Sequence, residues 1–236
     1  MRKLLLISLL GLITWLPASA PAQDVSFLVS MHGKQVGTAS YRFTGTPAGY
    51  DSSSLVKVSL QGLDYQLSKT EKLSSANQLQ HVLLSAIVNN SAVNVTARPD
   101  SAQLLINISA NGRSTTTLLA AHPGAVFLPD FDPGALETLL AIAAAHDNRD
   151  LWAIIPKQAG SVEPVTLATY PDEQGTLDGK PITVHHLVAT IAGANTDLFA
   201  SPESQLLQAE LPQEGFALVR QGFVLKPPAK PIAPAE

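Results

Sequence analysis

The chain has 236 residues, of which 45% are hydrophobic and 14% charged, with a formal net charge of −4 at pH 7. This apolar fraction is enough for a core and excludes a globally disordered chain, while the excess of acids disfavours nucleic acid or an anionic membrane surface as partner. There is no cysteine. Disulfides, thiol catalysis and thiolate metal sites are therefore excluded.

The N-terminus has the pattern of a secretory signal. Arg2 and Lys3 precede an uncharged apolar run of 13 residues, Leu4 to Leu16, after which Pro17 breaks the helix. Spanning a bilayer needs about 20 residues, so the run is too short for an anchor. We expect residues 1–22 to be removed after Ala22, leaving Gln23 first; the other candidate site, after Ala20, would leave Pro21 first.

Cleavage there would leave 13 basic and 19 acidic residues, a mature net charge of −6. Without disulfides, and with so compact a signal, the product is expected to be a bacterial periplasmic or secreted protein, soluble after cleavage, with no stable membrane insertion.

From residue 25 to residue 119 the sequence predicts a succession of short antiparallel strands. Apolar and polar residues alternate, and turn-forming residues such as Asn111-Gly112 recur about every ten positions. In the strand expected at Leu63 to Leu73, one side carries apolar residues together with Lys69 and Glu71. This mixture predicts an edge strand or a face that is partly exposed to solvent. The expected strands are 25–31, 36–43, 55–60, 63–73, 79–88, 93–98, 104–110 and 114–119.

One convincing helix follows, over residues 133–146. Asp132 is placed to cap it with its carboxylate, and Pro133 suits its first position. Leu136, Leu140 and Ala143 share one face, while Leu139, Ile142 and His146 share the next, so the helix is apolar on nearly all sides and needs cover.

Strands resume after the helix, with a turn predicted at 171–175 and a loop at 193–197. The expected strands are 151–155, 162–170, 182–191, 204–211 and 216–225. Residues 226–236 form a proline-rich tail that is expected to be extended and flexible.

These elements predict a mainly β protein with one principal helix. A long antiparallel sheet closes or curls, so we expect a strongly curved sheet or half-barrel, with the helix packed on its concave face. The organisation expected is a signal peptide at 1–22, a single β-rich domain at 23–225 and the tail.

No residue set identifies a reaction, and the sequence predicts neither a catalytic residue nor a cofactor nor a metal site. His185 and His186 are adjacent, so on a strand their rings point to opposite faces, and the other histidines lack metal-binding spacing. Asp130, Asp132 and His122 are the candidates for an unrecognised hydrolase site. Turn formation and helix capping explain the two aspartates without catalysis.

The apolar helix instead suggests a ligand. A concave sheet with a helix across it can hold an apolar or lipid-like molecule, and the residues expected to contact it are Leu136, Leu139, Leu140, Ile142 and Ala143. The alternative is a solid core, with the protein acting as a periplasmic interaction or structural module through exposed strand edges. The partners considered are therefore a lipid, a lipoprotein or another envelope protein, and not nucleic acid.

Three segments resemble an uncharacterised family of exported bacterial β-rich domains. They are the opening hairpin (Val25 to Leu28, Gly33 to Gly37 and Tyr41 to Phe43), the Phe127 to Asp130 turn before a leucine-rich helix, and the closing segments 206–211 and 216–220. The resemblance covers about residues 24–225. It implies a curved antiparallel sheet distantly similar to the outer-membrane lipoprotein carriers (LolA-like folds), which shelter acyl chains. No ligand-gating arginine can be matched residue by residue.

Overall fold

The computed structural model describes residues 24–46, 48–146, 149–157 and 159–227. The expected signal peptide and nearly all of the proline-rich tail lie outside these residues.

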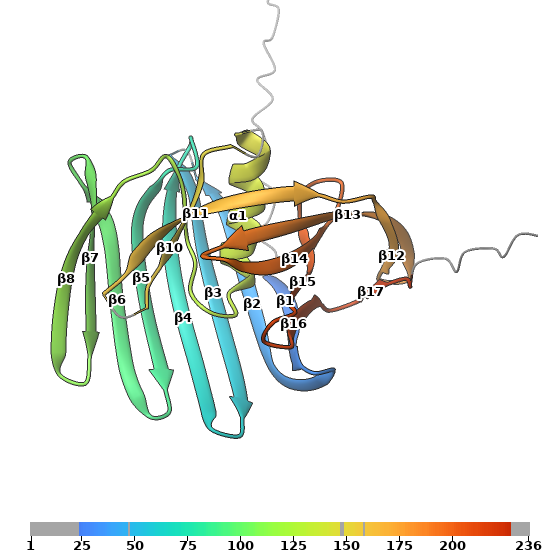
Figure 1. The fold of residues 1–236 in the computed structure, drawn as a ribbon, viewed down its shortest axis with the longest axis horizontal. Helices are drawn as coiled ribbons and strands as arrows, with labels where there is room; N and C mark the ends of the chain where they lie inside the picture. Colours follow the sequence, from blue (N-terminus) through green and yellow to red (C-terminus); the bar gives the residue numbers. More distant parts are fainter. Residues whose placement is uncertain (1–23, 47, 147–148, 158, 228–236) are drawn as a thin grey trace, which may run out of the picture.

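The described chain is mainly β, with one long, strongly curved sheet and one helix, as expected (Figure 1). Eight of its strands precede the short strand β9 in the chain: β1 (Asp24–Met31), β2 (Lys34–Thr46), β3 (Gly49–Leu60), β4 (Leu63–Ser74), β5 (Leu79–Val88), β6 (Ser91–Asp100), β7 (Gln103–Ala110) and β8 (Arg113–Ala120). The remaining elements are β9 (Gly124–Phe127), α1 (Pro133–Ala145), β10 (Leu151–Ile155), β11 (Ser161–Thr169), β12 (Glu173–Leu177), β13 (Lys180–Ile191), β14 (Ala194–Ala200), β15 (Leu206–Leu211), β16 (Phe216–Arg220) and β17 (Phe223–Leu225).

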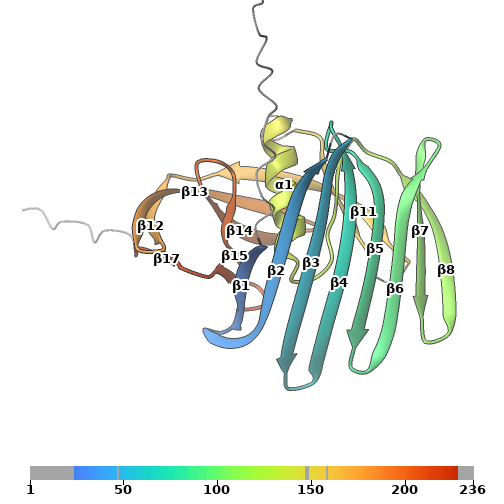
Figure 2. The same cartoon turned by 180° about the vertical axis from the view of Figure 1, so that it is seen from behind.

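Strands β1 to β8 form an antiparallel meander in which each strand pairs with the next. Figure 2 shows this meander from its outer face. Inward-facing positions are apolar and buried, such as Val56, Leu67 and Val95, while outward-facing positions are largely serine, threonine and asparagine. The alternation follows from the two-residue period of a strand.

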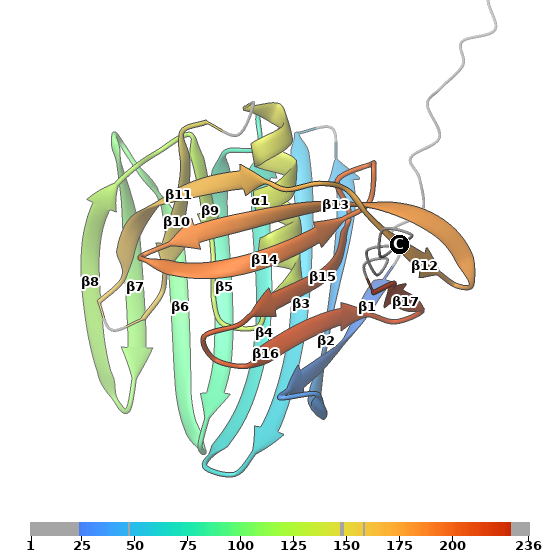
Figure 3. The ribbon, with the colours of Figure 1, turned by 45° about the vertical axis from the view of Figure 1, so that its right-hand side comes forward.

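The sheet continues through β1 into a second layer. β1 also pairs with β16, and pairing then runs through β15, β14, β13, β11 and β10 to β9. Of the strand pairs in the described residues, only β9 and β10 run parallel. The second layer crosses in front of the meander, as Figure 3 shows, with β9 lying against β5 and β11 against β8.

Helix α1 lies inside this curve and contacts strands of both layers, namely β2, β3, β9, β10 and β15. Its start follows the local sequence: Asp132 is the N-cap, its Oδ1 accepting from the N–H groups of Gly134 and Ala135, and Pro133 is the first helical residue. The cap and the range expected from sequence are both confirmed.

Four sequence-based expectations were wrong. β9 lies in a segment where no strand was predicted, and β12 and β14 overlap the turn at 171–175 and the loop at 193–197. The predicted strand 216–225 is two strands, because the chain turns at Gly222 (φ +83°) and β17 leaves to pair with β12. These segments become strands through pairing with distant partners, which their own sequences do not reveal.

The expectation for β4 was also wrong. The strand lies between β3 and β5, and Lys69 and Glu71 are buried on its inner face with 1% of their surface exposed. The two charges are tolerated there because they pair with each other and with Asp132.

Candidate functional site

The turn between β9 and α1 places two aspartates in different environments. Phe131 between them has a left-handed backbone (φ +57°), which is uncommon for a bulky residue. Its ring packs edge-on against Tyr65 and Phe216, with centroids 5.8 and 4.8 Å away. This packing holds the turn, so that Asp130 reaches the surface and Asp132 is buried.

Asp132 belongs to a fully buried ionic cluster, Lys69, Glu71 and Asp132. The Nζ of Lys69 lies 2.7 Å from Oδ2 of Asp132 and 3.0 Å from Oε2 of Glu71, and the three side chains have no exposed surface. Because Asp132 also caps α1, the cluster joins the beginning of the helix to the middle of the sheet.

The cluster holds two acids and one base, all fully buried. Burial disfavours the charge on Lys69, but Asp132 and Glu71 outweigh burial and raise its pKa. Burial raises the pKa of Glu71, with Lys69 opposing the shift and Asp132 adding to it. Oε1 of Glu71 accepts no hydrogen bond of ordinary geometry, and Oδ2 of Asp132 has the ion pair alone. The carboxylate oxygens of the cluster therefore outnumber the hydrogen-bond donors available to them.

A third acid, the largely buried Glu137, attaches the helix to the other layer. Glu137 accepts a hydrogen bond from the backbone N–H of Leu206 in β15. Burial raises the pKa of this carboxyl, while the Leu206 N–H and the hydroxyl of Tyr41 lower it. Polar contacts as well as apolar packing therefore attach α1 to each of the two layers.

An apolar cavity opens on the concave face beside the Phe131 turn, and we call it the trough. It has a volume of about 320 Å³. Inward-facing residues of β4 to β7 form its floor, and two loop segments cover it: Tyr65, Leu84, Ala86, Val88, Val93, Val95, Ile108 and Ala110, with Pro129, Asp130, Pro156 and Lys157.

Two charged residues stand at the edge of the trough. Asp130 and Lys157 form an ion pair of 2.9 Å, and both side chains are about half exposed. They also border a neighbouring cavity of about 140 Å³, which Leu136 and Phe131 line. An apolar floor with a charged edge suits a molecule with an apolar chain and a polar head.

The residues expected to contact a ligand lie mostly within the protein core. Leu136, Leu139, Leu140, Ile142 and Ala143 are all buried. Leu136 borders the 140 Å³ cavity, and Ile142 borders a separate cavity of about 300 Å³ between α1, β2, β3 and β4. The trough itself is lined by strands and loops, which sequence reasoning did not single out.

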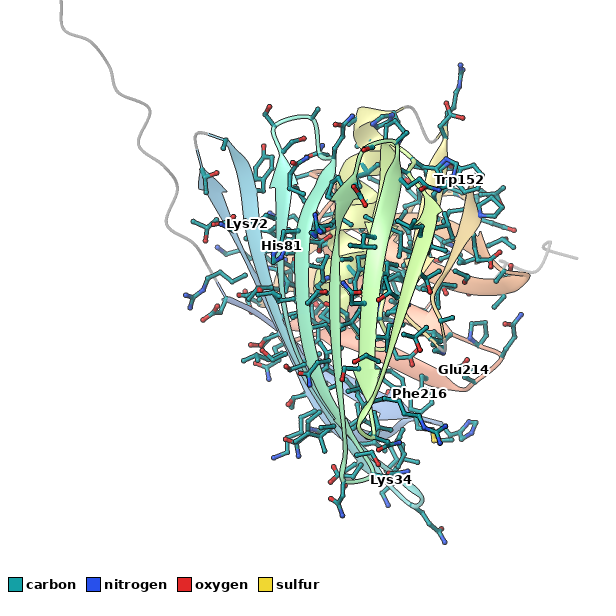
Figure 4. All side chains as sticks on the ribbon, turned by 90° about the vertical axis from the view of Figure 1, so that its left-hand side faces the viewer. Lys34, Lys72, His81, Trp152, Glu214 and Phe216 are labelled. Atoms are coloured by element: carbon teal, nitrogen blue, oxygen red, sulfur yellow. The ribbon has the colours of Figure 1, made fainter. Side chains whose placement is uncertain are left out.

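The three candidates for a hydrolase site lie apart. Asp130 pairs with Lys157, Asp132 with Lys69, and the ring of His122 stacks on Trp152 at 3.7 Å. Figure 4 shows Trp152 well separated from Phe216, the residue against which the Phe131 turn packs. Within the described ranges, no hydrogen bond or ion pair joins any two of the three candidates.

The paired histidines each have acidic neighbours. His185 Nδ1 lies 2.8 Å from Asp172, and His186 lies 2.8 Å from Asp197 and 3.4 Å from Glu173. The ring of His186 stacks on Phe199, which belongs to a small separate core under β12 and β17. These contacts join β12, β13 and β14.

Sequence reasoning missed the functional potential of Lys69 and Glu71. The signal was available, because a lysine and a glutamate two positions apart on the apolar side of a strand must pair or remain unsatisfied. Their third partner, Asp132, is distant in sequence and already had a sufficient role as a cap.

Comparisons with family models, curated proteins and solved structures find no match. Among the described residues, no helix has the length and apolar character needed to cross a membrane.

Proposed function

We propose that this exported chain binds a lipid-like ligand that has one apolar chain, and that the trough holds this chain. The observation that carries the proposal is the trough itself: about 320 Å³, apolar along β4 to β7, and open at an edge that carries Lys157 and Asp130. Ligand pockets usually have volumes of about 300–1,000 Å³, so the trough is large enough for one small amphiphile.

The trough exposes apolar surface that the folded chain does not cover. Val88, Val93 and Ala110 are only partly buried, although they point to the concave side. Covering such surface with an acyl chain contributes about 0.8 kcal/mol for each methylene group buried. A polar head would remain at the open edge, where the Lys157 ammonium group offers a partner.

Export and the resemblance to exported β-rich domains support the same proposal. An export signal would deliver the chain to the bacterial envelope, where lipids and lipoproteins are the abundant apolar ligands. The absence of a convergent polar site at Asp130, Asp132 and His122 in the described structure favours binding over hydrolysis.

A tryptophan placed in the trough tests the proposal. Val93→Trp fills the cavity from β6, and Arg98→Trp puts the same side chain on the outer face of the same strand. With a fluorescent fatty acid as the probe, we expect Val93→Trp to weaken binding at least about tenfold, or about 1.4 kcal/mol. Arg98→Trp should bind as the wild type does.

A wild-type chain that binds neither this probe nor lipids extracted from bacterial envelopes would overturn the proposal. Equal weakening by both tryptophans would place the ligand outside the trough and overturn the site. Circular dichroism of each variant confirms that loss of binding is not loss of fold.

A further inference from the structure

The buried ionic cluster brings together the groups that form an amide bond. An amine, Nζ of Lys69, lies 2.7 Å from a carboxyl oxygen of Asp132, and a second carboxyl, Glu71, lies 3.0 Å from the same amine. We propose that Lys69 and Asp132 condense to an intramolecular isopeptide bond, with Glu71 as the proton acceptor. This bond would join β4 to the start of α1.

The two oxygens of Asp132 are held in distinct ways that suit this reaction. Oδ1 accepts hydrogen bonds from Gly134 N–H (2.9 Å) and Ala135 N–H (3.3 Å) at the helix N-terminus. These donors stabilise the negative charge that develops on this oxygen when the amine adds to the carboxyl carbon. Oδ1 then becomes the amide oxygen. Oδ2, whose one polar contact is Lys69, is free to leave.

The atoms of the step balance without any other reactant. The Lys69 ammonium passes one proton to Oδ2 of Asp132, and the neutral amine attacks Cγ of the protonated carboxyl. The Nζ–Cγ bond forms, Nζ gives a second proton to Oε2 of Glu71, and this proton passes to Oδ2 as the Cγ–Oδ2 bond breaks and Oδ2 leaves as water. Glu71 ends ionised as it began, and nothing is oxidised or reduced.

Burial makes a neutral amide a stable alternative to the ion pair. The three side chains have no exposed surface; the cross-strand neighbours of Lys69 and Glu71 are the buried Leu84 and Val82 on β5 and the buried Ser54 and Ser52 on β3. Condensation replaces two buried charges with a neutral amide, which removes their desolvation cost together with the ion pair that offsets it. Because burial raises the pKa of Glu71, this carboxyl can hold the proton during the transfer.

The bond would give a chain without cysteine a covalent staple. Residues 69 and 132 are far apart in sequence, so the bond closes a long loop and restricts the unfolded chain, as a disulfide would. The geometry thus assigns the cluster a covalent role in addition to its electrostatic one.

Intact-mass spectrometry of the purified full chain tests the proposal directly. We expect the mass to be lower than that of the sequence by one water molecule, and trypsin to release a branched peptide that contains both Lys69 and Asp132. The branched peptide is essential, because succinimide formation at Asp178-Gly179 would remove the same mass. Full mass without the branched peptide overturns the proposal, whatever the variants do.

Variants then assign the roles. Glu71→Gln should be folded by circular dichroism but keep the full mass, and Asp132→Ala should do likewise at its own calculated mass. If Glu71→Gln still forms the branched peptide, Glu71 is not the proton acceptor. Arg42→Met, which removes the exposed ion pair between Arg42 and Asp24 at 2.6 Å, is the matched control and should form the bond as the wild type does.

Discussion

Glu137 of α1 accepts a hydrogen bond from the backbone N–H of Leu206, and this contact attaches the helix to β15 in the layer opposite the meander. The carboxyl is largely buried, and its pKa is raised chiefly by that burial. The helix is therefore anchored at a titratable group.

Replacing Glu137 with glutamine should change how stability depends on pH. With a raised pKa, the folded chain keeps the Glu137 proton at pH values where the unfolded chain has already released it. The contribution of this group is thus fully present below the unfolded pKa and is lost as the pH rises through the folded pKa. Glutamine does not titrate and can still accept from Leu206.

Urea unfolding from pH 4 to pH 7 measures this difference. We expect the free energy of unfolding of Glu137→Gln, relative to wild type, to increase with pH across that range. A difference that stays constant with pH would mean that the Glu137 pKa is not raised in the folded chain.

Gly134 allows α1 to approach the sheet closely. A Cβ atom at this position would lie 2.5 Å from Oγ of Ser54 and 2.9 Å from Cβ of Tyr41. Gly134→Ala should therefore destabilise the protein by about 1–3 kcal/mol, although alanine is the better helix former. Thermal or urea unfolding checks this.

Ala141 provides the control for this prediction, because it lies on the exposed side of the same helix. Ala141→Gly should cost about 0.5–1 kcal/mol through helix propensity alone. If Gly134→Ala is neutral or stabilising, the helix and sheet are not in the close contact described.

Lys157 should make the trough prefer ligands that have an anionic head. Lys157→Ala removes the ammonium at the edge of the trough, so an anionic fatty acid should bind more weakly by about 0.5–1.5 kcal/mol. The matching fatty alcohol, which has the same chain and no charge, should bind unchanged. Equal effects on both ligands would show that Lys157 does not contact the head.

Local signals in the sequence were enough to predict the helix and most of the meander. Asp132-Pro133 fixes the helix start through a cap that involves only nearby atoms, and Asn111-Gly112 marks a turn whose backbone these residues favour. The predicted range 79–88 coincides with β5. The local sequence alone is enough to determine such elements.

What the sequence concealed depends on partners distant in the chain. β14 contains Asn195 and Asp197, which are typical of loops, yet Asp197 is satisfied on a strand because it meets His186 on β13. Lys69 and Glu71 led to the prediction of a partly solvent-exposed face for the same reason. The sequence does not show that Asp132 will lie beside them. The trough likewise exists only once the two loops fold over the meander.

Removing the base from the buried ionic cluster gives the sharpest test of its energetics. Lys69→Met leaves Glu71 and Asp132 buried side by side without a cation and also removes the amine of the proposed isopeptide bond, so it should destabilise the chain by at least about 3–5 kcal/mol at pH 7. In the double variant Lys69→Met with Glu71→Leu, one of these carboxylates is gone, while Asp132 keeps its two helix N–H donors. The double variant should therefore be more stable than the single one, although each change alone is destabilising. Urea unfolding of the wild type, both single variants and the double variant measures this coupling. Additive losses would mean that Lys69 and Glu71 do not interact in the folded protein.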